Sequence, residues 1–291
     1  MGPLLQWQSE LGPLREPALL VALEGFVDAG AVAATAGMFL RHRWQSQLVA
    51  TFDREELIDY RARRPTVVVD SGLVKRVQWP DIELLVARPD GPRDALLLLG
   101  PEPDARWSAF AQSVVDLCRQ TGVHAVVMLG AYPAAAPHTR PVRIMRASNN
   151  ARLVSGEPAG QLVPDAGDVP GYTGPIGVAT ALQVALGDAG IPSVGLWAEV
   201  PHYIAASPNP AAALALVRAV SKVMGTDVDA TELEAAAKLH AEQVDEAVTE
   251  HPEAAELVEA LEHHVDAGNV EERLPSGDDI AAEIERFLRN Q

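Results

Sequence analysis

Short apolar runs alternate with amphipathic stretches along most of the chain. The first run, ALLVAL at residues 18–23, is followed by Glu24, Gly25 and a series of small residues at helical spacing. An unbroken apolar run of this length predicts a strand buried on both faces, and small residues allow a helix to lie close to it. We therefore expect a buried strand, a tight turn and a helix that begins near Asp28, a candidate N-cap, and ends near residues 41–43.

The alternation continues through the next 200 residues. The apolar runs predict strands at 48–53, 66–70, 82–100 as a hairpin pair, 123–132, 143–149, 151–156 and 193–203, and the helical patterns cover 104–121, 176–190 and 209–224. A long Gly- and Pro-rich loop is expected at 156–175. Strands that alternate with helices typically form a sheet covered on both faces, so the pattern predicts an α/β fold for residues 1–226.

The charge pattern separates the C-terminal region from the rest. The whole chain carries a net charge of −17, of which residues 1–226 contribute −2 and residues 227–291 contribute −15. TELE at 231–234 fits a capping box at a helix start, and residues 280–288 read as a last amphipathic helix. We predict that residues 227–291 form an acidic helical C-terminal extension that takes part in self-association, because its apolar stripes are too narrow to fold alone.

The amino-acid composition limits the cell compartments and the classes of partner that fit this chain. Cys118 is the single cysteine, which excludes an internal disulfide and favours a reducing compartment. The first residues lack the basic and apolar regions of a signal peptide, and no run of about 18 apolar residues occurs. Acidic balance and short arginine clusters argue against nucleic-acid binding. We expect a cytoplasmic protein without membrane contact, and the sequence shows no metal-binding or cofactor motif.

Polar residues gather where the predicted strands end. If these strands are parallel neighbours, their ends share one crevice at the sheet edge. The candidate crevice residues are Glu24, Gly25, Asp28, Gly30, Glu102, His138, Arg140, Glu199 and His202. Acids and histidines together can transfer protons, and the alternative is that they cap helices and bond loop amides. Tyr60, Arg61 and Arg64 are candidate anion contacts, or a solvated run of charges.

Gly25 and Gly30 have the spacing of the first and last glycines of a phosphate loop. However, Ala31 and Val32 stand where that loop needs Lys and Ser or Thr, so the groups that contact phosphate are missing. A strand-to-helix corner that needs small residues explains the two glycines better.

Six stretches carry a resemblance to a known family. They are EGFVDAGAVA (24–33), FDREELIDYRARRP (52–65), GPEPDARW (100–107), PHTRP (137–141), GPIGVATAL (174–182) and PHYIAASPNPAAALALV (201–217). In this order they resemble the proteasome assembly chaperone 2 family, in its actinobacterial branch. The resemblance implies a three-layer α/β/α sandwich like that of nucleoside phosphorylases, with a helical C-terminal extension in this branch. In eukaryotic relatives it implies a dimeric chaperone that helps proteasome α-subunits to form a ring.

The sequence therefore predicts a non-enzymatic assembly factor. Its expected partners are protein subunits, with proteasome α-subunits as the possibility that the resemblance implies, and we expect a homo-oligomer. The alternative is a small-molecule hydrolase or a nucleoside-phosphorylase-like enzyme that uses the crevice at the carboxyl ends of the strands.

Overall fold

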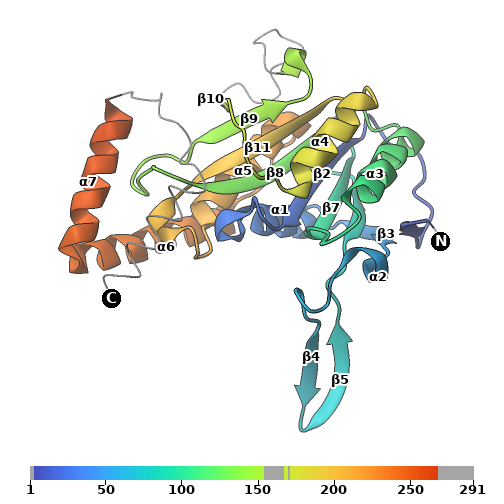
Figure 1. Ribbon diagram of the computed structural model, residues 1–291, viewed down its shortest axis with the longest axis horizontal. Coiled ribbons are helices and arrows are strands. Elements are labelled where there is room, and N and C mark those ends of the chain that lie inside the picture. The colour runs from blue at the N-terminus through green and yellow to red at the C-terminus, as the bar shows by residue number, and fades with distance from the viewer. Residues whose placement is uncertain (1–2, 154–166, 170, 268–291) are drawn as a thin grey trace.

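A mixed sheet forms the centre of the computed structural model, which describes residues 3–153, 167–169 and 171–267 (Figure 1). Within these ranges the sheet has nine strands in the order β1-β3-β6-β7-β2-β8-β11-β9-β10. In that order the strands are Leu5–Trp7, Gln47–Phe52, Glu83–Ala87, Ala95–Pro101, Ala18–Glu24, Ala125–Ala134, Ser193–Pro201, Ile144–Ser148 and Gly167–Asp168. The four central strands β7, β2, β8 and β11 are parallel to one another.

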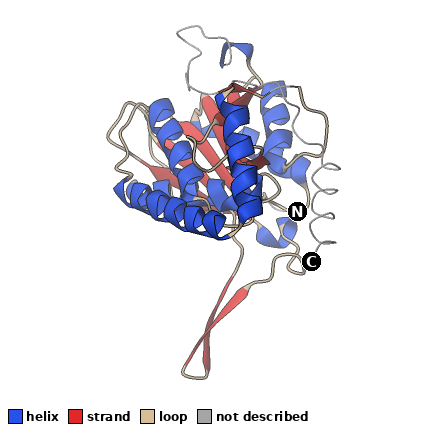
Figure 2. Ribbon diagram, turned by 90° about the vertical axis from the view of Figure 1, so that its left-hand side faces the viewer, coloured by secondary structure: helices blue, strands red, loops and turns tan. Residues whose placement is uncertain are grey.

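Helices cover both faces of the sheet, which gives three layers (Figure 2). One face carries α1 (Val32–Arg43) and α5 (Pro210–Met224), and the other carries α3 (Trp107–Thr121) and α4 (Val178–Asp188). The central strands are apolar at almost every position because both of their faces are covered. The predicted α/β architecture is confirmed.

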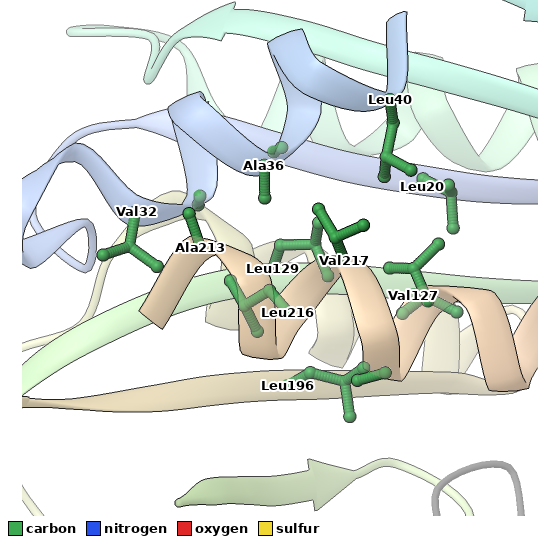
Figure 3. Packing of buried hydrophobic residues seen from close by; sticks show 14 of the residues in the cluster. Leu20, Val32, Ala36, Leu40, Val127, Leu129, Leu196, Ala213, Leu216 and Val217 are labelled. Atoms are coloured by element: carbon green, nitrogen blue, oxygen red, sulfur yellow. The ribbon is translucent and has the colours of Figure 1, made fainter. Parts of the chain in front are cut away.

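The core on the α1 and α5 face is built from alternate residues of the strands. Leu20 of β2, Val127 of β8 and Leu196 of β11 point toward the two helices, as Figure 3 shows. Facing them are fully buried helix residues, among them Ala36 and Val217. The intervening strand residues, such as Leu19 and Val21, pack on the opposite face against α3 and α4. Period-two alternation thus divides each strand between two apolar clusters.

The strand predicted at 66–70 exists but lies outside the main sheet. In the part of the chain that the structure describes, β4 (Thr66–Asp70) pairs only with β5 (Leu73–Gln78), and the two strands form an antiparallel hairpin. The sequence interpretation missed β5. The hairpin projects away from the body of the molecule (Figure 1). It follows the short helix α2 (Arg54–Leu57), and we call it the arm.

Two smaller expectations were wrong. A 3₁₀ turn at Ala151–Leu153 replaces the start of the strand expected at 151–156, and the rest of that segment lies outside the described residues. The capping box is also absent, because Thr231 is already inside its helix. Instead the Asp229 carboxylate accepts a hydrogen bond from the Thr231 N–H at 3.1 Å. The Thr231 hydroxyl donates to the same carboxylate at 2.7 Å, and this bond, followed by the backbone bond, lowers the pKa of Asp229.

The acidic extension is mostly helical from Thr231 to Asp266. It consists of α6 (Thr231–Glu250) and α7 (Pro252–Asp266), and α6 packs against α5 partly through the buried Leu233. The helix expected at 280–288 lies outside the described residues. The division into two domains at residue 226 stays a prediction. No helix among the described residues is long and apolar enough to cross a membrane.

Candidate functional site

The parallel strands bring their carboxyl ends to one edge of the sheet. Glu24 of β2 lies in register with Pro101 of β7, and Pro201 of β11 lies in register with Ala134 of β8. The residues that follow these strands therefore form a rim along one edge. The rim has two parts, which bond to different elements.

The first part, which we call the corner, is organised by Glu102. One of its carboxylate oxygens accepts the Phe26 N–H at 2.9 Å, and the other accepts the Val178 N–H at the start of α4. The side chain is buried, and Gly25 leaves the space that it needs, since a Cβ there would lie 2.1 Å from Glu102 Oε2. Glu102 thus joins the turn after β2 to the N-terminus of α4, where a carboxylate also meets a favourable helix dipole.

Asp28 is the second buried carboxylate of the corner, and it bonds to the beginning of α1. Its carboxylate accepts the Ala33 N–H at 2.6 Å and the Ala34 N–H at 3.3 Å. Burial raises the pKa of Asp28 to about 6, against the opposing effect of these two backbone bonds. Between Asp28 and α1 the chain makes a 3₁₀ turn in which Gly30 has φ +63°, and a Cβ there would lie 2.8 Å from the Ser207 carbonyl oxygen.

The second part of the rim is the loop 137–143 between β8 and β9, and its first anchor is His138. The His138 Nε2 lies 2.9 Å from Asp245 Oδ1 of α6, and its Nδ1 lies 2.6 Å from the Tyr203 hydroxyl. An ionised carboxylate can only accept, so Nε2 carries a proton toward Asp245, and Nδ1 shares a second hydrogen bond with the Tyr203 hydroxyl. The same hydroxyl accepts the His138 backbone N–H at 2.8 Å.

Arg140 provides the second anchor of this loop. Its guanidinium donates to both carboxylate oxygens of Asp266, at 2.9 and 2.7 Å, and to Glu262 at 3.0 Å. Both acids belong to α7, and the Thr139 hydroxyl also donates to Glu262. Hydrogen bonding to Arg140 lowers the pKa of Asp266. We call this set of contacts, together with His138–Asp245, the clasp, because it holds the acidic helices against the rim.

Glu199 and His202 at the end of β11 complete the rim. Glu199 accepts the Tyr132 hydroxyl at 3.1 Å and lies 3.5 Å from an Arg143 nitrogen. Burial and the neighbouring Glu199 carboxylate raise the pKa of Tyr132, so this phenol stays protonated. The His202 Nδ1 donates to the Ala134 carbonyl at 3.2 Å.

The rim encloses little free space. His138, Arg140 and Glu199 line one pocket of about 40 Å³ beneath the clasp, and Glu102 lines a separate pocket of about 20 Å³ beside Trp197. Ligand sites usually measure about 300–1,000 Å³, so these two pockets hold a few water molecules at most. Three candidate residues therefore share one pocket, Glu102 lines another, and Asp28 is turned toward helix α1.

A larger pocket lies elsewhere. It measures about 670 Å³ and is lined by residues 7–14 together with Gln120 and Thr121 at the end of α3. Glu10 is its only titratable side chain, so it offers few groups for chemistry. Across the described residues no three His, Cys, Asp or Glu side chains gather as metal ligands.

The three candidate anion contacts lie at the root of the arm. The Tyr60 hydroxyl donates to Glu55 at 2.7 Å, and its ring packs on Trp79 with centroids 5.1 Å apart. Burial and the Glu55 carboxylate raise the pKa of Tyr60. Arg61 and Arg64 have exposed side chains. Tyr60 therefore already contacts a carboxylate of its own chain.

The sequence interpretation missed the partners of the loop 137–143, which are Tyr203 after β11 and three acids on α6 and α7. Tyr203, Asp245, Glu262 and Asp266 lie 65 to 126 residues from the loop that they contact. No local motif marks them. The available signal was the charge split, since an extension with a net charge of −15 needs basic counter-surfaces and Arg140 is one.

Comparison with known proteins places the chain in a family. Residues 22–248, from β2 to the end of α6, match the model of the PAC2 family. The chain belongs to the PAC2 family. This finding confirms the resemblance carried by the six sequence stretches. Among curated proteins no match was found.

Solved structures from both actinobacteria and archaea resemble this chain. A Corynebacterium glutamicum protein of unknown function is 32% identical, with a TM-score of 0.82 over 91% of this chain and 98% of that one. A proteasome-assembly chaperone homologue from Mycobacterium tuberculosis is 35% identical, with a TM-score of 0.74 over 83% of this chain and 99% of that one. An archaeal proteasome activator from Pyrococcus furiosus, 17% identical with a TM-score of 0.67 over 84% and 97%, shares the fold.

Proposed function

We propose that the protein is a non-enzymatic assembly factor that binds other protein subunits. The observation that carries the proposal is the exposed apolar surface of the corner. Phe26 is 66% exposed and Ile176 is 43% exposed, although each adjoins a backbone segment that Glu102 holds in place. Large apolar side chains presented on a fixed backbone are typical of protein-binding sites.

The chemistry of the rim supports binding over turnover. Glu102, Asp28, His138 and Arg140 already bond to groups of their own chain, and these bonds stabilise corners and helices. The named relative from Mycobacterium tuberculosis is a proteasome-assembly chaperone homologue, so proteasome α-subunits are the first partners to test. We further propose that the protein acts in the cytoplasm as a homo-oligomer, which agrees with a single, buried cysteine.

Pull-down with α-subunits and their precursors tests subunit binding. The wild-type protein should capture a complex. The double variant Phe26→Ser, Ile176→Ser should reduce the captured amount at least tenfold, because it removes both apolar side chains that would contact the partner. Val184→Ser is the matched control, since Val184 is equally exposed but lies on α4. Capture unaffected by the corner substitutions would contradict the proposal.

A turnover screen tests the enzymatic alternative on the same preparation. Nucleosides, phosphate esters and amides should remain unchanged. Turnover that disappears in Asp28→Ala, His138→Ala or His202→Ala, with the fold intact by circular dichroism, would reverse the assignment.

A further inference from the structure

The pocket of about 670 Å³ lies between the first loop of the chain and the end of α3. It is lined by residues 7–14 and by Gln120 and Thr121, the last two residues of α3. In Figure 1 this loop passes α3 on the side of the molecule that holds the N-terminus. Strand β8 begins soon after α3 ends, so the pocket lies toward the amino ends of the parallel strands, opposite to the rim. Its volume falls within the range of small-molecule sites, about 300–1,000 Å³.

The loop that forms one wall of the pocket is held in place by the body of the protein. The Gln8 N–H donates to the Val49 carbonyl at 2.8 Å, and Arg88 donates to the Leu11 carbonyl at 3.3 Å. Leu11 and Leu14 also pack on the apolar core of the α3 and α4 face. A wall that is already ordered loses little conformational entropy when a ligand binds.

Trp7 supplies an aromatic surface in the pocket. Leu5 of β1 packs on the core of the α3 and α4 face, and Trp7, two residues further on, lies on the same face of the strand. Trp7 is 38% exposed, so part of this residue stays accessible to a ligand in the pocket. The face of an indole ring carries partial negative charge and attracts cations.

Two further features of the pocket favour positive charge. The exposed Glu10 side chain forms no hydrogen bond or ion pair with another described residue, and it is the one charged side chain in the described lining. Gln120 and Thr121 lie at the C-terminus of α3, where the helix dipole places partial negative charge. An aromatic surface, a carboxylate and a helix C-terminus therefore surround the same space.

Two arginines lie near the pocket but do not line it. Arg88 lies 4.0 Å from Asp94, and Arg119 lies 3.9 Å from Asp116, so each already has a carboxylate beside it. The lining residues other than Glu10 are uncharged. Glu10 therefore determines the charge that the pocket presents to a ligand.

We propose that this pocket binds an organic cation, which is an ammonium or guanidinium group attached to an apolar body. The cationic group contacts the Trp7 indole and the Glu10 carboxylate, and the apolar body contacts Leu11 and Leu14. A free amine and the Lys or Arg side chain of another protein share this chemistry, so the experiment must distinguish the two sources. Binding here is independent of the proposed binding of other subunits at the corner.

Titration of the full-length protein with phenethylammonium tests the inference. The NMR signal of the Trp7 indole N–H, identified by its loss in Trp7→Phe, should shift as this probe is added. Phenethyl alcohol has a similar shape but no charge, and it should bind about tenfold more weakly. Equal binding of the two compounds overturns the inference, because the pocket would then select only the apolar body.

Glu10→Gln removes the charge of the pocket and keeps the shape of the side chain. It should weaken the binding of phenethylammonium about fivefold, as expected for the loss of an exposed ion pair. Glu16→Gln is the matched control, since Glu16 carries the same charge in the same loop but does not line the pocket. It should leave the affinity unchanged. An equal effect of the two substitutions, or none in Glu10→Gln, overturns the inference.

The tripeptide acetyl-Ala-Lys-Ala-amide tests a protein side chain as the source of the cation, with norleucine in place of lysine as its uncharged control. Tighter binding of phenethylammonium assigns the pocket to a free amine, and tighter binding of the lysine peptide assigns it to a side chain of another protein. Either result supports the inference. If neither probe shifts the Trp7 signal, the inference is overturned, whereas the corner proposal is still decided by its own pull-down.

Discussion

The corner and the clasp place similar polar residues at the same edge of the sheet and use them differently. At the corner, the buried carboxylates of Glu102 and Asp28 accept backbone N–H groups. At the clasp, the partly exposed guanidinium of Arg140 pairs with side chains of α7. A polar residue after a parallel strand is thus no catalytic signature by itself. What it does depends on whether the next element presents free amides or opposite charges.

The largest effect should come from Glu102→Ala at the corner. It leaves the N–H groups of Phe26 and Val178 without their acceptor, and a buried donor without a partner costs about 1–3 kcal/mol. We expect the free energy of unfolding to fall by about 3 kcal/mol in denaturant titration. Glu102→Gln keeps one acceptor and should lose less. If the free energy of unfolding falls no further than it does for a substitution at an exposed position, the corner does not depend on this carboxylate.

Asp28→Ala should have the second largest effect. The substitution removes the acceptor for the Ala33 and Ala34 amides at the start of α1, and loss of a helix cap costs about 1–2 kcal/mol. Chemical denaturation at neutral pH measures this loss. An unchanged midpoint would mean that water replaces the carboxylate at no cost.

The pH dependence gives Asp28 a second test. Its pKa is about 6 in the folded protein, above its ordinary value of 3.8, so the folded state holds a proton more tightly between these two values. The proton-linked part of the Asp28 contribution to stability is therefore fully present below about pH 4 and is lost as pH rises through 6, whereas the bonds to the Ala33 and Ala34 amides remain. Asp28→Asn does not titrate, so its stability relative to wild type should increase over this interval and stay level above it.

Arg140→Ala should have the smallest effect on the stability of the whole protein. Its main effect should be local, on helix α7. Exposed ion pairs contribute little to overall stability, so the unfolding midpoint should stay the same. Hydrogen exchange in α7 should accelerate several-fold, because the substitution removes the bonds to Glu262 and Asp266. Lys238→Ala is the control, since it removes an exposed pair with Glu242 within α6. Equal exchange of α7 in both variants would contradict the clasp.

The corner was more predictable from sequence than the clasp. The run at 18–23 and the small residues after Asp28 predicted a strand, a turn and a capped helix. The prediction that Asp28 is the N-cap of this helix was wrong, because α1 begins after Ala31. The Asp28 carboxylate instead bonds amides five and six residues further on, since a 3₁₀ turn intervenes. The clasp joins residues more than 100 positions apart, and no local pattern specifies such a pair.

The arm shows a different limit of sequence patterns. TVVVD at 66–70 has the β-branched composition of a buried strand, yet it lies in solvent. The composition of a segment predicts that it forms a strand. Whether that strand joins the main sheet depends on the direction in which the chain leaves α2. Val68 and Val69 are alike in sequence and are distinguished only by the pairing with β5.

Hydrogen exchange of the intact protein at two salt concentrations tests the difference between corner and clasp most directly. Between about 0.05 and 0.5 M salt the screening length shortens severalfold, which weakens exposed ion pairs and leaves buried bonds nearly unchanged. The amides of Ala33 and Val178 should stay protected at both concentrations, while α7 and the loop 137–143 should lose protection at high salt. Loss of protection at the corner together with α7, or in neither region, would contradict the account.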